Sequence, residues 1–325
     1  MKVALVTGST GFLGLNLVEA LGHAGWSVTA LHRPGAELGE LSASGASFVE
    51  GDILDPASLR RALAAGVDAV FHLAASLSVW RPMNGVQRRI NVDGTRNVVD
   101  AALHAHCKRF VHVSTVSTFG DHPHPIDEET LQTGNSSWIN YESTKWLAEE
   151  EVRRGIARGL PAIIVCPCAV VGPCDRHGWA QLFRQIRDRK VLASPPGGGT
   201  FNDVRAVAEG LIAAAERGKV GDIYILSGDD MSFADFFRLI AETLGVPPPK
   251  RVAPRALLMT FARIGDMVSR VTHKQPDMTP ELAALVSGWK TTNSTKAERE
   301  LGYRPRPARQ AVKDSIEWLK ARGLL

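Results

Sequence analysis

The sequence is poor in cysteine and nearly balanced in charge. Its four cysteines are Cys107, Cys166, Cys168 and Cys174. The spacing of Cys166 and Cys168 suits neither a local disulfide nor a zinc ribbon, so we expect free thiols and no metal site. Basic residues outnumber acidic ones by only four among 325 residues. This excess is too small to indicate a nucleic-acid-binding protein.

Long apolar runs are also missing. The first run, residues 3–6, meets Gly8 and two further glycines before it reaches the length of a signal peptide. The most apolar later stretch, residues 256–271, contains two arginines and one aspartate and falls short of the roughly 20 apolar residues that cross a bilayer. We expect a soluble, cytoplasmic protein without a membrane span, in which residues 256–271 form either a lid or a core helix.

Short runs rich in β-branched residues alternate with segments of helical periodicity. The strand-like runs are residues 3–6, 27–31, 67–72, 109–113 and 162–166. The segments between them that carry apolar side chains at helical spacing are residues 12–24, 59–64, 90–105 and 141–158. Alternating strands and helices of these lengths predict βαβ units. The fold class is therefore α/β, with a doubly wound parallel sheet (Rossmann fold).

The chain is long enough for one large domain and one smaller lobe. After Cys166, proline and glycine accumulate, most densely at residues 195–199, and such residues mark loops and a change of lobe. Helix and strand patterns in residues 203–228 then return the chain to the sheet. We predict a larger domain from residues 1–167 and 203–228, and a smaller, mostly helical C-terminal lobe from residues 168–202 and 229–325.

Three glycines follow the first strand at intervals of three, and a helix pattern begins directly after them. Glycines let the backbone approach a pyrophosphate, whose charge the free N–H groups of a helix N-terminus stabilise. A plain tight turn is the alternative, but the strand-turn-helix context favours a dinucleotide site. The larger domain is thus predicted to bind a dinucleotide, with contacts from Gly8, Thr10, Gly11, Phe12, Leu13 and Gly14.

The second strand ends in a basic residue where NAD-binding proteins have a carboxylate. The sequence here is Leu31-His32-Arg33-Pro34, without the Asp or Glu that hydrogen-bonds the ribose 2′-OH of NAD. The guanidinium of Arg33 can pair with a 2′-phosphate through two hydrogen bonds. We therefore expect NADP(H) rather than NAD(H), although a solvent-exposed surface arginine is the alternative.

Tyr141 and Lys145 lie four residues apart in a predicted helix. Residues at this spacing share a helix face, with a rise of about 6 Å between them. A free phenol has a pKa near ~10, and a nearby cation lowers it, so Lys145 can assist proton transfer by Tyr141. An ordinary amphipathic helix surface is the alternative. Ser114 and Thr115 favour the chemical interpretation because they follow a strand, at the sheet edge where doubly wound folds bind ligands.

These motifs resemble those of the extended short-chain dehydrogenases/reductases, and the resemblance spans nearly the whole chain. It rests on the glycine turn, the Tyr141/Lys145 pair, the Ser/Thr-rich segment before Gly120 and a C-terminal segment at residues 294–303. It implies that Thr115, Tyr141 and Lys145 are catalytic, with Ser114 as the neighbour to test in place of Thr115. In such a site the tyrosine moves a proton, the hydroxyl stabilises charge on the substrate oxygen, and the nicotinamide moves a hydride.

The same resemblance implies cofactor contacts beyond the glycine turn. Asp52 would meet the adenine amine, Ile53 the adenine ring, and residues 73–75 would close over the cofactor, although helix–strand packing also explains small residues there. Asn91 would lie beside the active site or merely cap a helix. Pro167 belongs to a loop near the nicotinamide, in which Cys166 replaces an arginine of the family. The predicted contacts of this group are Arg33, Asp52, Ile53, Leu73, Ala74, Ala75, Asn91 and Pro167.

Within the family, the sequence most resembles the dihydroflavonol reductase and 3β-hydroxysteroid dehydrogenase-like branch. Nucleotide-sugar epimerases and dehydratases carry an arginine before an aspartate and use it to grip a diphosphate, whereas Asn202 precedes Asp203 here. The resemblance implies an NADP(H)-dependent oxidoreductase that interconverts a ketone or aldehyde with an alcohol on a largely apolar small molecule. It also implies a homodimer through two helices of the larger domain.

Two alternatives stay open: an NAD(P)-dependent sugar epimerase or dehydratase, and a non-catalytic NADPH-sensing protein. A fold alone excludes neither. Apolar residues in predicted loops are candidates to line the substrate pocket, although ordinary core packing accounts equally well for about half of them. These candidates are Leu77, Val79, Trp80, Met83, Trp138 and Trp179.

Overall fold

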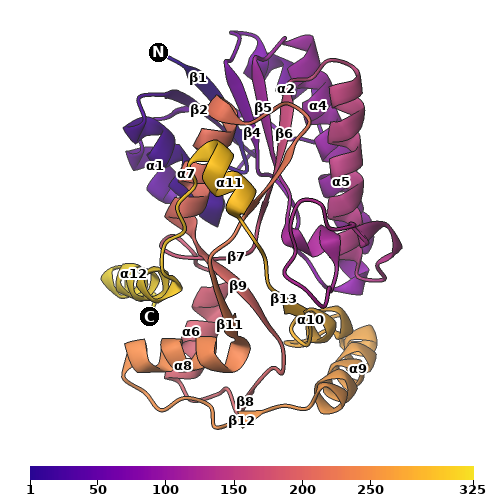
Figure 1. Cartoon of the computed structure of the whole chain (residues 1–325), viewed down its shortest axis with the longest axis vertical. Helices are drawn as coiled ribbons and strands as arrows, with labels where there is room; N and C mark the ends of the chain where they lie inside the picture. Colours follow the sequence, from indigo (N-terminus) through magenta and orange to yellow (C-terminus); the bar gives the residue numbers. More distant parts are fainter.

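The computed structural model describes residues 1–325, and a parallel sheet of seven strands forms its larger lobe (Figure 1). The strands are β1 (Val3–Thr7), β2 (Ser27–His32), β3 (Ser47–Glu50), β4 (Ala69–His72), β5 (Arg109–Val113), β6 (Ala162–Pro167) and β10 (Ile223–Leu226). They lie in the order β10-β6-β5-β4-β1-β2-β3, and every neighbouring pair is parallel. The predicted doubly wound sheet is confirmed.

Helices cover both faces of this sheet. On one face lie α1 (Phe12–His23), α7 (Val204–Arg217) and α11 (Thr295–Leu301), and on the other α2 (Pro56–Leu63), α4 (Gly94–His104) and α5 (Asn140–Ala157) (Figure 1). Successive residues of β1 alternate between the two layers: Ala4 and Val6 pack with α1 and α7, whereas Leu5 packs with α2 and α4. Burial on both faces explains why these strands are continuous apolar runs.

The strand order reverses between β1 and β4, which are neighbours in the sheet. The chain leaves the two strands in opposite directions, and in doubly wound folds this leaves a crevice at their carboxyl ends. The glycine turn follows β1 and residues 73–75 follow β4. The sheet therefore brings both predicted cofactor segments to the same edge.

The smaller lobe contains a second sheet that the sequence analysis did not predict. Its strands are β7 (Ala169–Val171), β9 (Gly198–Asp203), β11 (Asp229–Ser232) and β13 (Trp289–Lys290). The glycine-rich stretch expected to be a loop includes the start of β9. A side chain at Gly198 would lie 2.7 Å from the Met231 carbonyl oxygen, so glycine here permits close backbone approach within a strand.

Helices complete the smaller lobe. Three of them pack against the second sheet and share one apolar core: α6 (Trp179–Arg187), α8 (Phe233–Leu244) and α12 (Ala308–Ala321). Two more, α9 (Arg255–Thr272) and α10 (Pro280–Leu285), lie together at the opposite side of this lobe (Figure 1). The short strands β8 (Ala193–Ser194) and β12 (Arg251–Val252) pair beneath them.

One C-terminal segment returns to the larger lobe. Ala297 and Leu301 of α11 are buried in the same core as α7, and the Tyr303 hydroxyl donates a 2.6 Å hydrogen bond to the Ser227 carbonyl after β10. Residues 295–303 thus lie with the larger sheet, whereas the predicted division placed them in the smaller lobe with the rest of 229–325. No helix in the structure combines the length and the apolar character needed to cross a membrane.

Candidate active site

The glycine turn after β1 is closed by backbone contacts that only glycine allows. Gly8 has φ = 71°, and a Cβ there would lie 2.7 Å from the Ala74 nitrogen at the end of β4. A Cβ at Gly14 would overlap the Gly8 carbonyl oxygen. No side chain caps the N-terminus of α1, so its backbone N–H groups can bind an anion. The turn, with Thr10 and Gly11 exposed at its apex, fits the pyrophosphate of a dinucleotide.

The end of β2 is joined to this turn. The Ser9 hydroxyl donates a 2.8 Å hydrogen bond to the Leu31 carbonyl, which holds the turn against the strand. Arg33, two residues later, is exposed and forms no ion pair. Its guanidinium is therefore free to bind a phosphate beside the turn.

The predicted adenine contacts follow β3. The Asp52 carboxylate accepts a 2.8 Å hydrogen bond from the Leu54 backbone, which shapes the loop around it. Ile53 is buried and packs so closely on α4 that a Cβ at Gly94 would lie 2.5 Å from its Cδ1 atom. In this structure Ile53 therefore fastens α4 to the loop and exposes little surface.

Asn91 lies in a single wide turn of helix (Arg89–Asp93) directly before α4. Its amide donates to the Ser76 carbonyl at 3.0 Å and to the Thr144 hydroxyl at 3.1 Å, and its oxygen accepts from the Ser76 N–H at 2.7 Å. The alternative that Asn91 caps a helix is wrong, because the helix continues through it. Its side chain instead ties the loop after β4 to α5, where Tyr141 and Lys145 lie.

Thr115 and Tyr141 meet at the carboxyl end of β5. Thr115 begins a short helical turn (Val116–Phe119) and is almost fully buried. Burial raises the pKa of Tyr141 to about 12, and a hydrogen bond with Thr115 opposes this rise. The expectation of a lowered pKa is not met in this structure, because the loss of water around the phenol outweighs every favourable contact.

Lys145 lies one helical turn further along α5 and is buried. Its ammonium donates a 2.8 Å hydrogen bond to the Val113 carbonyl at the end of β5. Burial lowers its pKa to about 8, while the carboxylate of Glu149 acts in the opposite direction. The charge on Lys145 is thus close to titrating at physiological pH.

A buried polar network lies beneath Lys145, and sequence reasoning did not identify it. Glu149 is fully buried and accepts hydrogen bonds from the Ser114 hydroxyl, from Gln132 at 2.8 Å and from Arg153 at 2.9 Å. Ser114 is therefore engaged below the site, whereas Thr115 contacts Tyr141. This arrangement favours Thr115 over Ser114 as the hydroxyl beside the tyrosine.

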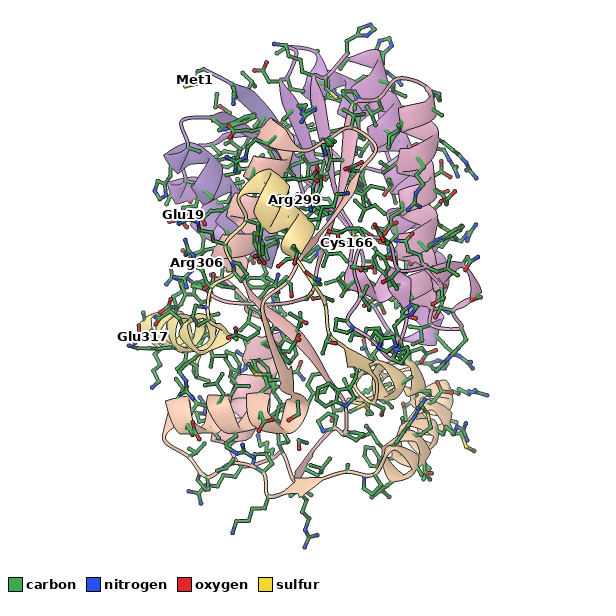
Figure 2. The ribbon with its side chains drawn as sticks, in the orientation of Figure 1. Met1, Glu19, Cys166, Arg299, Arg306 and Glu317 are labelled. Carbon is green, nitrogen blue, oxygen red and sulfur yellow. The ribbon has the colours of Figure 1, made fainter.

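Cys166 borders the same network from β6, and Figure 2 labels it in the interior of the molecule. Burial raises the pKa of its thiol well above the usual value, and Glu149 adds to this effect. The thiol is consequently protonated at neutral pH. At the position of the family's arginine, this chain therefore places a small neutral side chain.

Two buried histidines underlie the cofactor side. His72 at the end of β4 bonds through its two ring nitrogens to the hydroxyls of Thr7 (2.8 Å) and Thr95 (3.0 Å). His112 packs on it with ring centroids 5.4 Å apart, and neither of its nitrogens has a partner. Burial lowers the pKa of both imidazoles, to about 3 for His72. Both rings are therefore neutral at physiological pH.

The sequence profile of the NAD dependent epimerase/dehydratase family matches residues 4–227. The chain belongs to this family. Three relatives extend the likeness along the chain. Sterol demethylase protein B of Methylococcus capsulatus is 31% identical over 99% of both chains. A 4-hydroxy-2-methyl-3-oxo-4-farnesyl-3,4-dihydroquinoline-1-oxide ketoreductase of Stigmatella aurantiaca is 32% identical and covers 96% of this chain and 94% of its own.

The third relative is 3beta-hydroxysteroid-dehydrogenase/decarboxylase isoform 1 of Arabidopsis thaliana, 28% identical over 98% of this chain and 80% of its own. Among solved structures, a nucleoside-diphosphate-sugar epimerase from Pseudomonas aeruginosa is 25% identical, covers 100% of this chain and 99% of its own, and superposes with a TM-score of 0.84. The resemblance to extended short-chain dehydrogenases/reductases is confirmed, and the chain is an oxidoreductase of this epimerase/dehydratase family.

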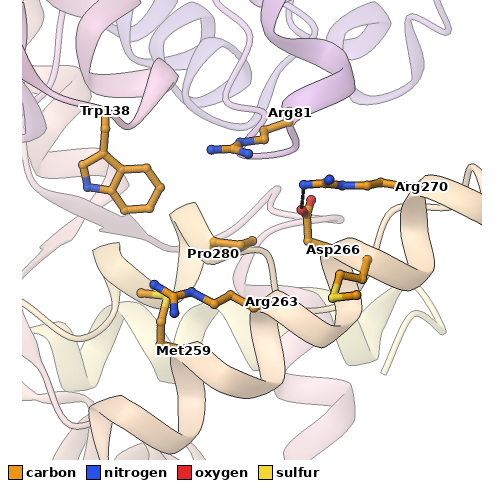
Figure 3. A pocket seen from close by; sticks show the side chains of 8 residues that line it. Arg81, Trp138, Met259, Arg263, Asp266, Arg270 and Pro280 are labelled. Carbon is orange, nitrogen blue, oxygen red and sulfur yellow. Dashed lines mark hydrogen bonds and ion pairs between the residues drawn. The ribbon is translucent and has the colours of Figure 1, made fainter.

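A cavity of about 610 Å³ lies between the two lobes of this family member (Figure 3). Trp138, three residues before Tyr141, and Arg81 reach it from the larger lobe. The opposite wall consists of α9 and the start of α10. The residues on that wall are Met259, Arg263, Asp266, Met267, Arg270 and Pro280.

The three tryptophans among the predicted pocket residues have three different roles. Trp138 lines the cavity, as expected. Trp80 holds α9 in place, because its indole N–H donates a 3.0 Å hydrogen bond to the Ser269 hydroxyl. The prediction for Trp179 is wrong: it packs edge-to-face on Phe236 at 4.9 Å and bonds the Val170 carbonyl, within the core of the smaller lobe.

The helix α9 is not a core helix. Only Ala262 and Ser269 of its eighteen residues are buried, and both lie on the side that packs against the protein. Arg263 and Arg270 were missed as site residues because the sequence shows them only as breaks in an apolar run. The two arginines lie on one side of the helix because they are two turns apart. This spacing could have indicated that they face the same site.

Proposed function

We propose that this family member is an NADP(H)-dependent reductase of ketones or aldehydes on a largely apolar small molecule, and catalyses the reverse oxidation. The observation that carries the proposal is the meeting of Thr115, Tyr141 and Lys145 at the carboxyl end of β5, beside the switch-point crevice. The names of two relatives support the class of substrate, since one is a ketoreductase of a farnesylated ring and another acts in sterol demethylation.

In this proposal, side chains of the protein carry out the proton transfer. Tyr141, with a pKa of about 12, is a neutral phenol at physiological pH and can protonate the oxygen of a carbonyl. Thr115 donates a hydrogen bond to that oxygen while negative charge builds on it. Lys145 stabilises the phenolate left behind. When bound, the nicotinamide supplies the hydride for reduction.

The preference for NADP(H) is proposed from Arg33. It is the unpaired cation at the end of β2, and no carboxylate occupies the position that would bind a ribose 2′-OH. The other proposed cofactor contacts are those of the glycine turn, the loops after β3 and β4, Asn91 and Pro167.

A nucleotide-sugar epimerase or dehydratase is the second candidate, favoured by the likeness to the Pseudomonas enzyme. One contact argues against it. Asn202 stands where the sugar-nucleotide enzymes carry their diphosphate-binding arginine, but its amide is fully buried and donates to the Leu226 carbonyl. Asp203 beside it is paired with Arg205 and caps α7. Neither side chain is available to hold a diphosphate.

The proposal is tested by measuring the consumption of NADPH, and separately of NADH, in the presence of each member of a panel of apolar ketones and aldehydes. We expect turnover of a ketone with NADPH preferred to NADH. A parallel assay with nucleotide sugars distinguishes the second candidate, because an epimerase converts its substrate without net loss of cofactor. Conversion of a nucleotide sugar together with inert ketones would overturn the reductase proposal.

A further inference from the structure

The outer face of α9 carries a stripe of exposed apolar side chains. Leu257, Phe261, Ile264, Val268 and Val271 follow one another at steps of four, three, four and three residues, so they lie on one face of the helix. Each is between 56 and 81% exposed. In Figure 1 this helix lies at the edge of the smaller lobe, away from both sheets. No other element of the chain covers the stripe.

The net positive charge of the protein lies in the segment that contains this helix. Between residues 250 and 277 there are six basic residues and two acidic ones. This excess of four equals the net charge of the whole chain, so the remaining residues balance to zero. Only one of the six basic side chains, Arg270, forms an ion pair in the structure, with Asp266 at 2.9 Å. The others are Lys250, Arg251, Arg255, Arg263 and Lys274.

An exposed apolar stripe on one face of a helix, with basic residues on its polar face and in the adjoining segments, is typical of a helix that lies in the headgroup region of a bilayer. Its apolar side chains enter the acyl boundary while the long basic side chains reach the headgroups. Clusters of four to eight Lys and Arg favour anionic lipids, and the six basic residues on and beside α9 fall within this range. We propose that the outer face of α9 docks the protein on an anionic lipid surface.

A second copy of the chain is the rival occupant, because a four-three repeat also suits helix pairing. Two copies of segment 250–277, each with a net charge of four, would repel one another, whereas the same charge attracts anionic headgroups. The charge therefore favours the lipid surface.

The position of α9 relates this docking to the cavity between the lobes. The side of the helix that carries Arg263 and Arg270 lines the cavity between the lobes (Figure 3), and the stripe lies on the face turned away from that cavity. The use of this docking rests on the proposed apolar substrate. The same helix forms the docking face and a wall of the cavity, so a single helix about 10 Å across separates the cavity from the membrane in which such a molecule dissolves.

Sedimentation with vesicles tests the proposal without any turnover. One set of vesicles contains equal parts of phosphatidylcholine and phosphatidylglycerol, and the other contains phosphatidylcholine alone. We expect the wild-type chain to sediment with the anionic vesicles and to be released by high salt. Replacing Lys250→Gln and Arg251→Gln together should lower the partition coefficient roughly 25-fold, since each basic residue near such a surface contributes about five-fold. The matched pair on α2, Arg60→Gln and Arg61→Gln, should leave it unchanged.

A second arm removes the apolar stripe. Phe261→Ser with Val268→Ser should abolish sedimentation with anionic vesicles, whereas Leu131→Ser with Leu192→Ser, which are also highly exposed, should not. Circular dichroism of each variant checks that it is folded. The proposal is overturned if the wild type stays in the supernatant, if the α9 variants sediment like the controls, or if they only turn a dimer into a monomer. Because binding is measured directly, failure of the reductase assay does not affect this result.

Discussion

Glu149→Gln is the sharpest test of how the protein controls the charge on Lys145. Glu149 lies one helical turn beyond Lys145, is fully buried and opposes the lowering of the lysine pKa to about 8. Two unit charges about 6 Å apart interact by about 3 kcal/mol at an effective dielectric constant near 20, which corresponds to about 2 pH units. Removing the carboxylate therefore leaves the ammonium less stable.

The assay is the pH dependence of turnover. If the charged form of Lys145 is required, wild-type activity falls as the pH rises through about 8. In Glu149→Gln this alkaline limb should move to lower pH by one to two units. Glu150→Gln is the matched control, because Glu150 also pairs with Arg153, at 2.7 Å, but is not among the groups that shift the pKa of Lys145. An alkaline limb that stays in place in Glu149→Gln, or moves equally in both variants, refutes the reasoning.

Stability gives a second readout of the same change. Glu149 accepts three hydrogen bonds with no access to water, and bonds to a charged group contribute about 1.5–3 kcal/mol each. Glutamine keeps part of this network, so we expect the free energy of unfolding in urea to fall by about 2–3 kcal/mol. A loss below about 0.5 kcal/mol would show that the carboxylate is not structurally required.

Three further predictions concern the cofactor side. The pKa of His72 is about 3 in the folded state and near 6.5 in the unfolded chain, so unfolding takes up a proton below pH 6.5. Between pH 6.5 and pH 5, His72 alone should lower the free energy of unfolding in urea by about 2 kcal/mol, and His72→Gln should remove this part of the loss. Gly14→Ala should abolish NADPH binding measured by fluorescence, because its Cβ overlaps the Gly8 carbonyl, whereas Gly22→Ala, 4.0 Å from the nearest atom, should bind normally. Arg33→Ser should raise the KM for NADPH about 10- to 100-fold and leave that for NADH nearly unchanged.

The larger sheet could be predicted because its strands are buried on both faces. Residues 109–113, for instance, were predicted as a strand and form β5 without a difference at either end. The second sheet could not, because β9 begins with two glycines whose role depends on neighbouring strands: Gly198 approaches the backbone of β11 and Gly199 that of β13. A strand of this kind has no apolar pattern in the sequence, so it can be recognised only from the position of the neighbouring strands in the structure.

The candidate site could likewise be predicted only in part from the sequence. Thr115, Tyr141 and Lys145 belong to local motifs, so their types and spacing predicted their meeting. The direction of the Tyr141 pKa was wrong because burial is a property of the folded protein. Glu149 was missed for a related reason: in the sequence it is one of three consecutive glutamates on a helix, and only the structure shows that it is the one without contact with water.

Turnover of the ketone identified in the panel, compared between wild type, Tyr141→Phe and Tyr224→Phe, tests the central claim most directly. Both variants remove one phenolic hydroxyl, but only Tyr141 lies beside Thr115, while Tyr224 bonds Glu300 at the far end of β10. We predict that Tyr141→Phe binds NADPH normally and loses at least about 100-fold in kcat, and that Tyr224→Phe stays within a few-fold of wild type. Full activity in Tyr141→Phe would contradict the account.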